Sequence, residues 1–74
     1  MTALLDAQGL KCPLPVLRAR KALRGVTPGE TLTILATDTA AMADFRAFCD
    51  QAGHEFVSGD EAAGVYTIVI RRKG

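Results

Sequence analysis

Two prolines that flank a single residue, Pro13 and Pro15, limit where this part of the chain can lie. Proline has no backbone N–H and a fixed φ, so it disrupts the interior of a helix or a central strand but fits the first turn of a helix. The residue before a proline is pushed toward extended geometry. The pair therefore predicts a helix that begins at Pro13, with Cys12 as its N-cap residue.

A cysteine at a helix N-cap lies in a positive electrostatic environment. Unpaired backbone N–H groups and the positive end of the helix dipole both favour the thiolate over the thiol. We therefore expect the pKa of Cys12 to lie below the ordinary thiol value, which would make it a nucleophile. The alternative is an ordinary helix start with an inert cysteine, and the second proline favours the functional interpretation.

The length of the chain allows one small domain, residues 1–74, near the lower limit for a self-sufficient hydrophobic core. Hydrophobic residues make up 49% and charged residues 23% of the chain, which argues against disorder. A net charge of +1 predicts no general affinity for polyanions. Basic residues nevertheless gather in the first predicted helix and near the C-terminus: Arg18, Arg20, Lys21, Arg24, Arg71, Arg72 and Lys73.

The ends of the chain and its cysteines bear on location and metal binding. We expect a cytoplasmic protein that does not enter membranes, because no apolar run is long enough to cross one and the start lacks the basic segment of a signal peptide.

A reducing compartment would keep Cys12 and Cys49 as thiols, and we expect Cys49 to be buried. Two cysteines and the single His54 cannot supply a tetrahedral zinc set, so we expect no metal.

The first half of the chain predicts two strands, each followed by a helix. Residues 3–7 form a short apolar run that ends at Gly9, and residues 13–24 show helical periodicity with a basic outer side. Thr31–Thr37 alternates and is rich in β-branched residues, as strands are. Asp38 is then the expected N-cap of a helix over residues 39–52, which ends at Gly53.

The last third predicts two more strands, over residues 54–57 and 65–71, joined by a polar hairpin loop over residues 58–64. The order is therefore βαβαββ. A strand, helix, strand unit requires a right-handed crossover, and the last two strands can pair antiparallel. We expect an α/β (α+β) two-layer sandwich with a mixed four-stranded sheet and two helices on one face.

Short motifs along almost the whole chain resemble the TusA/SirA-like sulfur-carrier family, whose hallmark is Cys-Pro-x-Pro. They are Gly9-Leu10-Lys11, Cys12-Pro13-Leu14-Pro15, Val16, Arg20-Lys21, Pro28-Gly29-Glu30, Phe48-Cys49, His54-Glu55 and Ile70-Arg71. The resemblance implies a compact two-layer sandwich and a cysteine that carries sulfane sulfur as a persulfide between proteins. One departure is Thr39, where many relatives have proline.

The resemblance also implies the roles of individual residues and partners. Cys12 would bear the sulfur, with Pro13 and Pro15 as scaffold. A cysteine desulfurase or rhodanese would donate sulfur, and an acceptor protein would pass it on, for example toward tRNA thiolation or sulfur metabolism. The protein would be a sulfurtransferase-like carrier rather than a complete enzyme, with no cofactor, and we expect a monomer.

Four residues of the first predicted helix form a candidate docking patch beside the thiol. Leu14 and Leu17 project from the basic side of this helix, with Arg18 and Lys21 around them. Exposed leucines are also common on surfaces without any binding role. The interpretation as a docking patch for donor and acceptor therefore requires a test.

Two other functions fit parts of the sequence. A thiol redox protein would also use Cys12, but it lacks an adjacent resolving thiol because Pro13 follows and Cys49 belongs to another helix. A regulatory or RNA-binding module would use the basic helix face and the basic tail. The four aromatic residues Phe45, Phe48, Phe56 and Tyr66 offer few stacking platforms, so direct nucleic-acid binding is the weaker interpretation. His54 has no catalytic partner nearby in sequence and is expected at the surface or at a sheet edge.

Overall fold

The computed structural model describes residues 2–73, which form two helices and four strands. In chain order these elements are β1 (Thr2–Ala7), α1 (Leu14–Leu23), β2 (Thr31–Ala36), α2 (Ala41–Ala52), β3 (Glu55–Ala62) and β4 (Val65–Arg71). The predicted order βαβαββ is confirmed. Among the described residues, no helix has the length and apolar character needed to cross a membrane.

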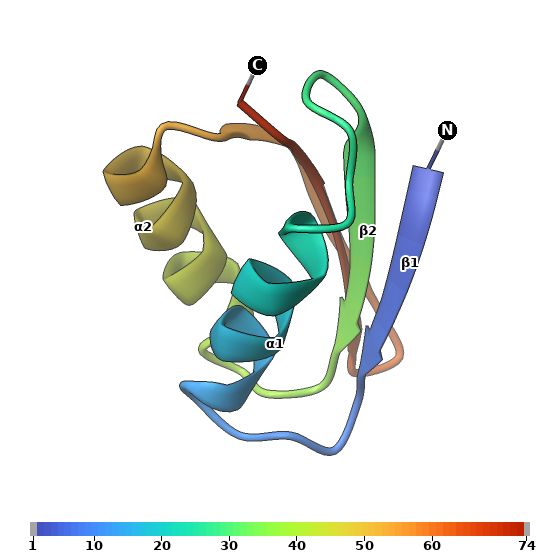
Figure 1. Cartoon of the computed structure of the whole chain (residues 1–74). Helices are drawn as coiled ribbons and strands as arrows, with labels where there is room; N and C mark the ends of the chain where they lie inside the picture. The colour runs from blue at the N-terminus through green and yellow to red at the C-terminus, as the bar shows by residue number, and fades with distance from the viewer. Residues whose placement is uncertain (1, 74) are drawn as a thin grey trace.

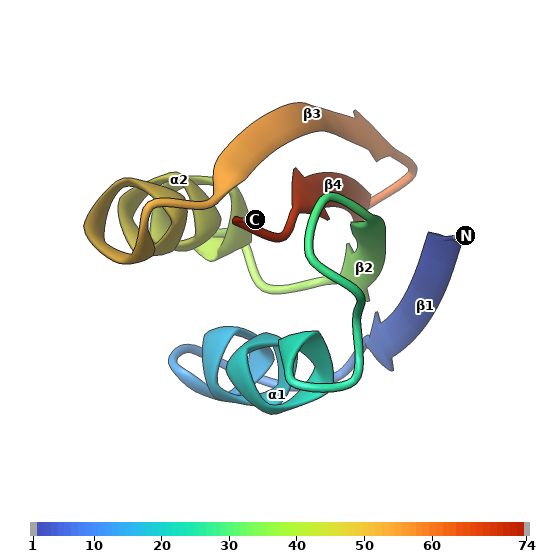
Figure 2. The same ribbon diagram turned by 45° about the horizontal axis from the view of Figure 1, so that its top comes forward.

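The strands form one mixed sheet in the order β1-β2-β4-β3. β1 and β2 are parallel, whereas β4 pairs antiparallel with both β2 and β3. Both helices cover the same face of this sheet, so the molecule has two layers (Figures 1 and 2). The predicted mixed four-stranded sheet and the placement of the helices are therefore confirmed.

The core lies between the sheet and the helices. Along β2, buried residues alternate with half-buried ones, and β4 ends in the same way, which is the pattern of strands with one face against helices. The α2 helix contributes Phe45, Phe48 and Cys49, all buried, and α1 contributes Ala19 and Leu23. The burial expected for Cys49 is confirmed, and this burial raises the pKa of its thiol.

The prediction for the final hairpin was wrong at β3. Residues 58–62 are strand rather than loop, and the turn consists of Ala63 and Gly64, both with positive φ. Positive φ at both central residues is the geometry that suits a two-residue hairpin. β3 is an edge strand and its second half is exposed, so its polar residues face solvent without breaking the pairing with β4. An irregularity between Phe56 and Ser58 shifts the register.

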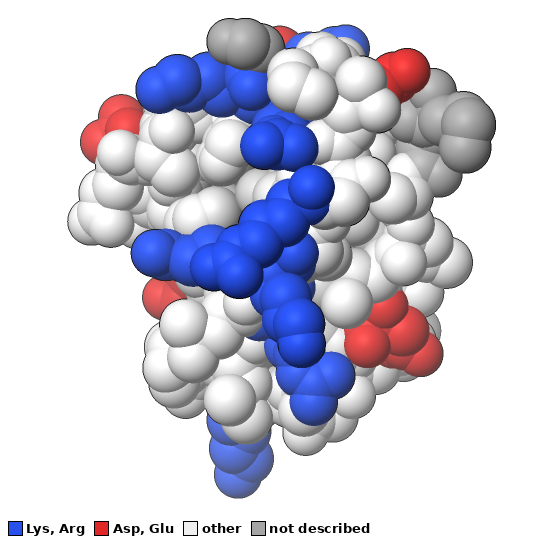
Figure 3. Space-filling view, in the orientation of Figure 1, with Lys and Arg blue, Asp and Glu red and all other residues white. Residues whose placement is uncertain are grey.

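The helix ends agree only partly with the predictions. Gly53 has φ 80° and ends α2, as expected for a left-handed C-terminal residue. Asp38 does not cap α2, because that helix begins at Ala41 with Ala40 in the cap position and no side-chain cap bond. The face shown in Figure 3 carries a band of lysine and arginine side chains over the helices, as the uneven distribution of charge had indicated.

Candidate functional site

The site lies where the parallel strands β1 and β2 end. Parallel strands present their carboxyl ends at the same edge of a sheet, so the loops after β1 and after β2 meet there. Two hydrogen bonds join these loops. The backbone N–H of Gly9 donates to Thr37 Oγ1 at 2.9 Å, and the backbone N–H of Cys12 donates to Asp38 Oδ2 at 2.9 Å. The cysteine loop is therefore held against the loop that leads into α2.

Cys12 lies just before α1, but not at its cap. The helix begins at Leu14 and Pro13 occupies the N-cap position, so the prediction that Cys12 is the N-cap residue was wrong. The N–H of Leu14 donates to the carbonyl oxygen of Lys11 at 2.8 Å, which closes a turn around Cys12 and Pro13 before the helix starts. The Cys12–Pro13 peptide bond is cis. Pro15 is buried in the first helical turn, in agreement with its predicted place.

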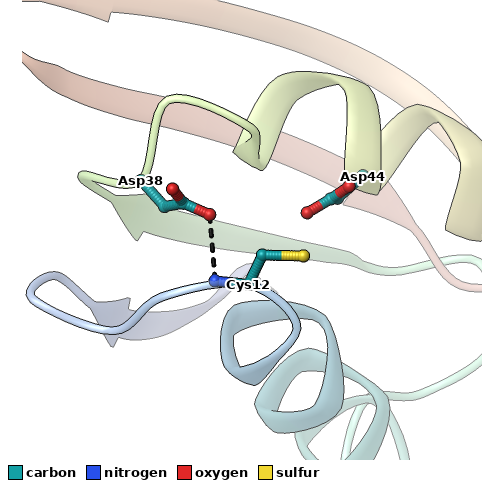
Figure 4. A group of neighbouring side chains, drawn as sticks. All are labelled: Cys12, Asp38 and Asp44. Atoms are coloured by element: carbon teal, nitrogen blue, oxygen red, sulfur yellow. Dashed lines mark hydrogen bonds between the residues drawn. The ribbon is translucent and has the colours of Figure 1, made fainter.

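Two carboxylates flank the thiol. Cys12 is exposed, and its sulfur lies near carboxylate oxygens of Asp38 and Asp44, with all three potential ligand atoms within 4.8 Å of one another. Figure 4 shows the Asp44 carboxylate, from the first turn of α2, on the same side as the Cys12 sulfur. The thiol therefore faces negative charge from α2 as well as the start of α1.

These carboxylates reverse the expected electrostatics. The Asp44 carboxylate, a potential hydrogen-bond acceptor for the thiol, raises the pKa of Cys12 above its ordinary value, and slight desolvation and the charges of Asp44 and Asp38 raise it further. The expectation of a lowered pKa was therefore wrong. It considered only the helix end, whereas α2 brings in a carboxylate that lies 32 residues further along the chain.

The same three residues are the only group among residues 2–73 that could bring three metal-ligating side chains together. They supply one sulfur and two carboxylate oxygens, and the Asp38 carboxylate already accepts the Cys12 N–H. Structural zinc sites require four ligands, mostly sulfur and nitrogen. We therefore assign no metal to this cluster.

The four residues of the candidate docking patch lie on one side of α1. Leu14, Leu17, Arg18 and Lys21 are spaced by three or four residues, which places them along a single helical stripe. All four are exposed, and the buried residues of α1 lie on its other side. We call these four residues the α1 stripe. It begins two residues after the thiol.

Sequence reasoning missed Thr37 and Asp44 and gave Asp38 a different role. The position of Asp38 and Thr37 directly after a strand parallel to β1 was the available signal, because it places them at the edge where the cysteine loop emerges. No comparable pattern pointed to Asp44, whose contact with Cys12 depends on how α2 packs beside α1. His54 is half-buried and directly precedes the edge strand β3, in agreement with the expected sheet-edge position, and its Nδ1 accepts the backbone N–H of Lys73 at 2.9 Å.

Comparison with known proteins places the whole chain in one family. The sequence model of the family described as Sulfurtransferase TusA matches residues 3–72. A putative sulfur carrier protein of Neisseria meningitidis serogroup B is 54% identical over 69 residues, which cover 93% of each chain. The sulfur carrier protein TusA of Allochromatium vinosum is 43% identical over 68 residues, covering 92% of this chain and 90% of the relative.

A solved structure shows the same fold. The crystal structure of a SirA-like protein from Desulfitobacterium hafniense superposes with a TM-score of 0.77 and 26% sequence identity, covering 100% of both chains. The family model, the curated relatives and this structure agree over nearly the full length of the chain. The chain belongs to the TusA family of sulfur carrier proteins.

Proposed function

We propose that Cys12 carries the sulfur, as a persulfide on its Sγ atom. The observation that supports this role is the difference between the two cysteines: Cys12 is exposed at a sheet edge, and Cys49 is buried in the core. A transferred sulfur must pass between two proteins, so its carrier atom has to be accessible to both. The buried thiol cannot serve this purpose without unfolding.

The transfer consists of two displacements at sulfur. The Cys12 thiolate attacks the terminal sulfur of a persulfide on the donor, a new S–S bond forms, and the donor leaves as a thiolate. Cys12 then bears –S–SH. A nucleophile on the acceptor attacks that terminal sulfur, the S–S bond of Cys12 breaks, and Cys12 returns as a thiolate that regains a proton. No net oxidant or reductant is consumed.

The carboxylate of Asp44 bears on the first step. Because the pKa of Cys12 is raised, most of the resting protein holds a protonated thiol at neutral pH. The thiol proton has to leave before or during attack, and the Asp44 carboxylate is a neighbouring group that could accept it. A donor that brings positive charge to Asp44 and Asp38 would lower the pKa of the thiol and favour attack. The acidic pair would thereby favour reaction within a complex over reaction in free solution.

A sulfur carrier works between a donor and an acceptor, and we propose their classes. The donor is a cysteine desulfurase or a rhodanese, and the acceptor is a protein of tRNA thiolation or of sulfur metabolism. Pro13 and Pro15 shape the loop, and the α1 stripe of Leu14, Leu17, Arg18 and Lys21 contacts the partners. The protein acts as a monomer in the cytoplasm, where the two free thiols of the chain would stay reduced.

The competing redox function has less support. A thiol oxidoreductase needs a second thiol that can resolve a mixed disulfide, and Cys49 is buried on α2. Persulfide transfer needs only one cysteine. The site therefore suits sulfur transfer better than disulfide exchange.

Intact mass spectrometry after incubation with a cysteine desulfurase and cysteine tests the proposal. We expect a gain of one sulfur atom that a reductant removes, that is lost in Cys12→Ser and that persists in Cys49→Ser. A Cys12→Ser protein that still gains sulfur, or a wild-type protein that gains none from several donors of these classes, would refute the assignment.

A further inference from the structure

A pocket of about 460 Å³ lies near the C-terminal ends of α1 and α2 and takes no part in the thiol site. Its wall includes Arg20 of α1, Arg24 at the C-cap of α1, Gln51 of α2, and His54 and Arg72. The α1 helix has ten residues and rises about 1.5 Å per residue, so Cys12 and Arg24 lie at opposite ends of about 15 Å of helix. The pocket is therefore a separate site.

The charge of this pocket is unbalanced. Three guanidinium groups line it and no carboxylate does. Within residues 2–73, none of these three arginines pairs with an acidic side chain, and Arg71 with Glu55 is the ion pair that the structure shows there. Arg24, the C-cap residue of α1, has helical dihedral angles and lies four residues after Arg20, a spacing at which like charges repel. An anion in the pocket would relieve this repulsion.

Proximity to a helix end explains only part of the arrangement. Cations near a helix C-terminus interact favourably with the dipole, which accounts for Arg20 and Arg24. Arg72 comes from the segment after β4 and is held over the same pocket by a hydrogen bond from its Nη1 to the carbonyl oxygen of Val26. The dipole of α1 does not explain why Arg72, from a different part of the chain, lies beside Arg20 and Arg24.

Several groups of the pocket are fixed in place before any ligand arrives. The Arg20 guanidinium lies over the Phe48 ring, 5.4 Å from its centroid, and the His54 ring lies 5.6 Å from the same ring. His54 accepts the Lys73 N–H at Nδ1, so in its neutral form the proton is on Nε2, which can donate to a ligand. Burial, Arg72 and Lys73 lower the pKa of His54, in that order of effect.

We propose that this pocket binds the phosphate group of a small phosphate ester, such as a nucleoside monophosphate. Guanidinium groups match the geometry of a phosphate and form charge-assisted hydrogen bonds with it. The volume lies within the range of small-ligand sites, and the pocket is an open depression within the basic face of the molecule. Leu23 and Ala52, which also line it, provide an apolar contact for the organic part.

The single histidine of the chain makes the binding measurable without a label. An NMR titration of His54, with and without inorganic phosphate or AMP, reports the charge next to it. We expect saturable binding of both ligands and a higher pKa for His54 when either is bound, since a bound anion favours the imidazolium. Tighter binding of AMP than of phosphate would identify an ester as the ligand, and equal binding would identify the free anion.

Two variants separate the pocket from general surface charge. Arg24→Gln should weaken binding about tenfold or more, because it removes a charge-assisted contact. Arg18→Gln lowers the charge of the same helix equally but lies outside the pocket, and it should change the affinity less than about twofold. Thermal unfolding would verify that both variants are folded.

Three results would overturn the proposal. The first is an equal loss of affinity in Arg24→Gln and Arg18→Gln, which would mean that the anion is attracted by the net charge of the protein and not by the pocket. The second is binding that leaves the pKa of His54 unchanged. The third is salt-dependent binding of single-stranded RNA without binding of phosphate or AMP, which would indicate an RNA surface instead.

Discussion

Replacing Leu14 and Leu17 together by serine tests whether the α1 stripe contacts a sulfur donor. These side chains lie in the first turn of α1, two and five residues after Cys12, and are 45% and 51% exposed. A donor that approaches the thiol closely enough for transfer would cover them. The double variant removes this apolar surface and leaves Cys12, Asp38 and Asp44 in place.

The exposed fractions set the expected size of the effect. Full burial of a leucine side chain contributes about 1.5–3 kcal/mol, so the exposed half of each would contribute about 0.8–1.5 kcal/mol on docking. The two together give about 1.5–3 kcal/mol, which corresponds to roughly a tenfold to hundredfold weaker complex. The other half of each side chain packs against the protein, so the double variant should also lose some stability, and its folded state has to be verified.

The assay is the rate of sulfur uptake from a persulfide-loaded cysteine desulfurase at concentrations well below saturation. Leu4→Ser is the matched control, since Leu4 is 68% exposed on β1 and lies outside the α1 stripe. We expect slower uptake in the double variant only, with both variants folded at the assay temperature. Unchanged uptake in the double variant, or an equal loss in Leu4→Ser, would refute the docking role.

Three further outcomes follow from the site and the core. Asp44→Asn should lower the pKa of Cys12 and speed its alkylation by iodoacetamide at pH 7, whereas the exposed Asp50→Asn on the same helix should not; equal rates would exclude the acidic control of the thiol. Phe45→Ala should destabilise the protein by about 3–5 kcal/mol in urea unfolding, because Phe45 is 0% exposed, and a loss below about 1 kcal/mol would contradict its place in the core. The pKa of His54 is lower in the folded protein than in the unfolded chain, so the unfolded chain binds a proton at His54 more readily. The contribution of neutral His54 to the free energy of unfolding is therefore complete above the ordinary histidine pKa of 6.5 and is lost as the pH falls below that value. Urea midpoints of wild type and His54→Gln should therefore converge between pH 7.5 and pH 5, and a constant difference would contradict this linkage.

The strands that pack against helices could be predicted from the sequence, and the edge strand could not. β2 and β4 were predicted to within a residue, because one face of each is buried and the sequence alternates accordingly. β3 was predicted too short because Ser58, Gly59 and Asp60 are typical of turns. Their strand geometry comes from pairing with β4, which no local pattern encodes.

The candidate site divides in the same way. Local sequence predicted the thiol, its prolines and the exposed leucines. The carboxylates that control the pKa of the thiol could not be predicted, because Asp38 reaches Cys12 across the edge of two parallel strands and Asp44 reaches it from another helix. The N-cap argument considered only the dipole of α1, which lowers the pKa of the thiol. The carboxylate of Asp44 on the neighbouring helix α2 raises this pKa and has the larger effect.

The burial of Cys49 has a consequence for how long a cargo can be kept. A persulfide next to a second accessible sulfhydryl would close to an internal disulfide and release its outer atom as sulfide. Because Cys49 on α2 is buried in the hydrophobic core, the folded chain cannot lose its sulfur by this intramolecular reaction. The loaded protein would then lose its sulfur only through encounters with other molecules, and its lifetime would depend on the thiols around it in the cell.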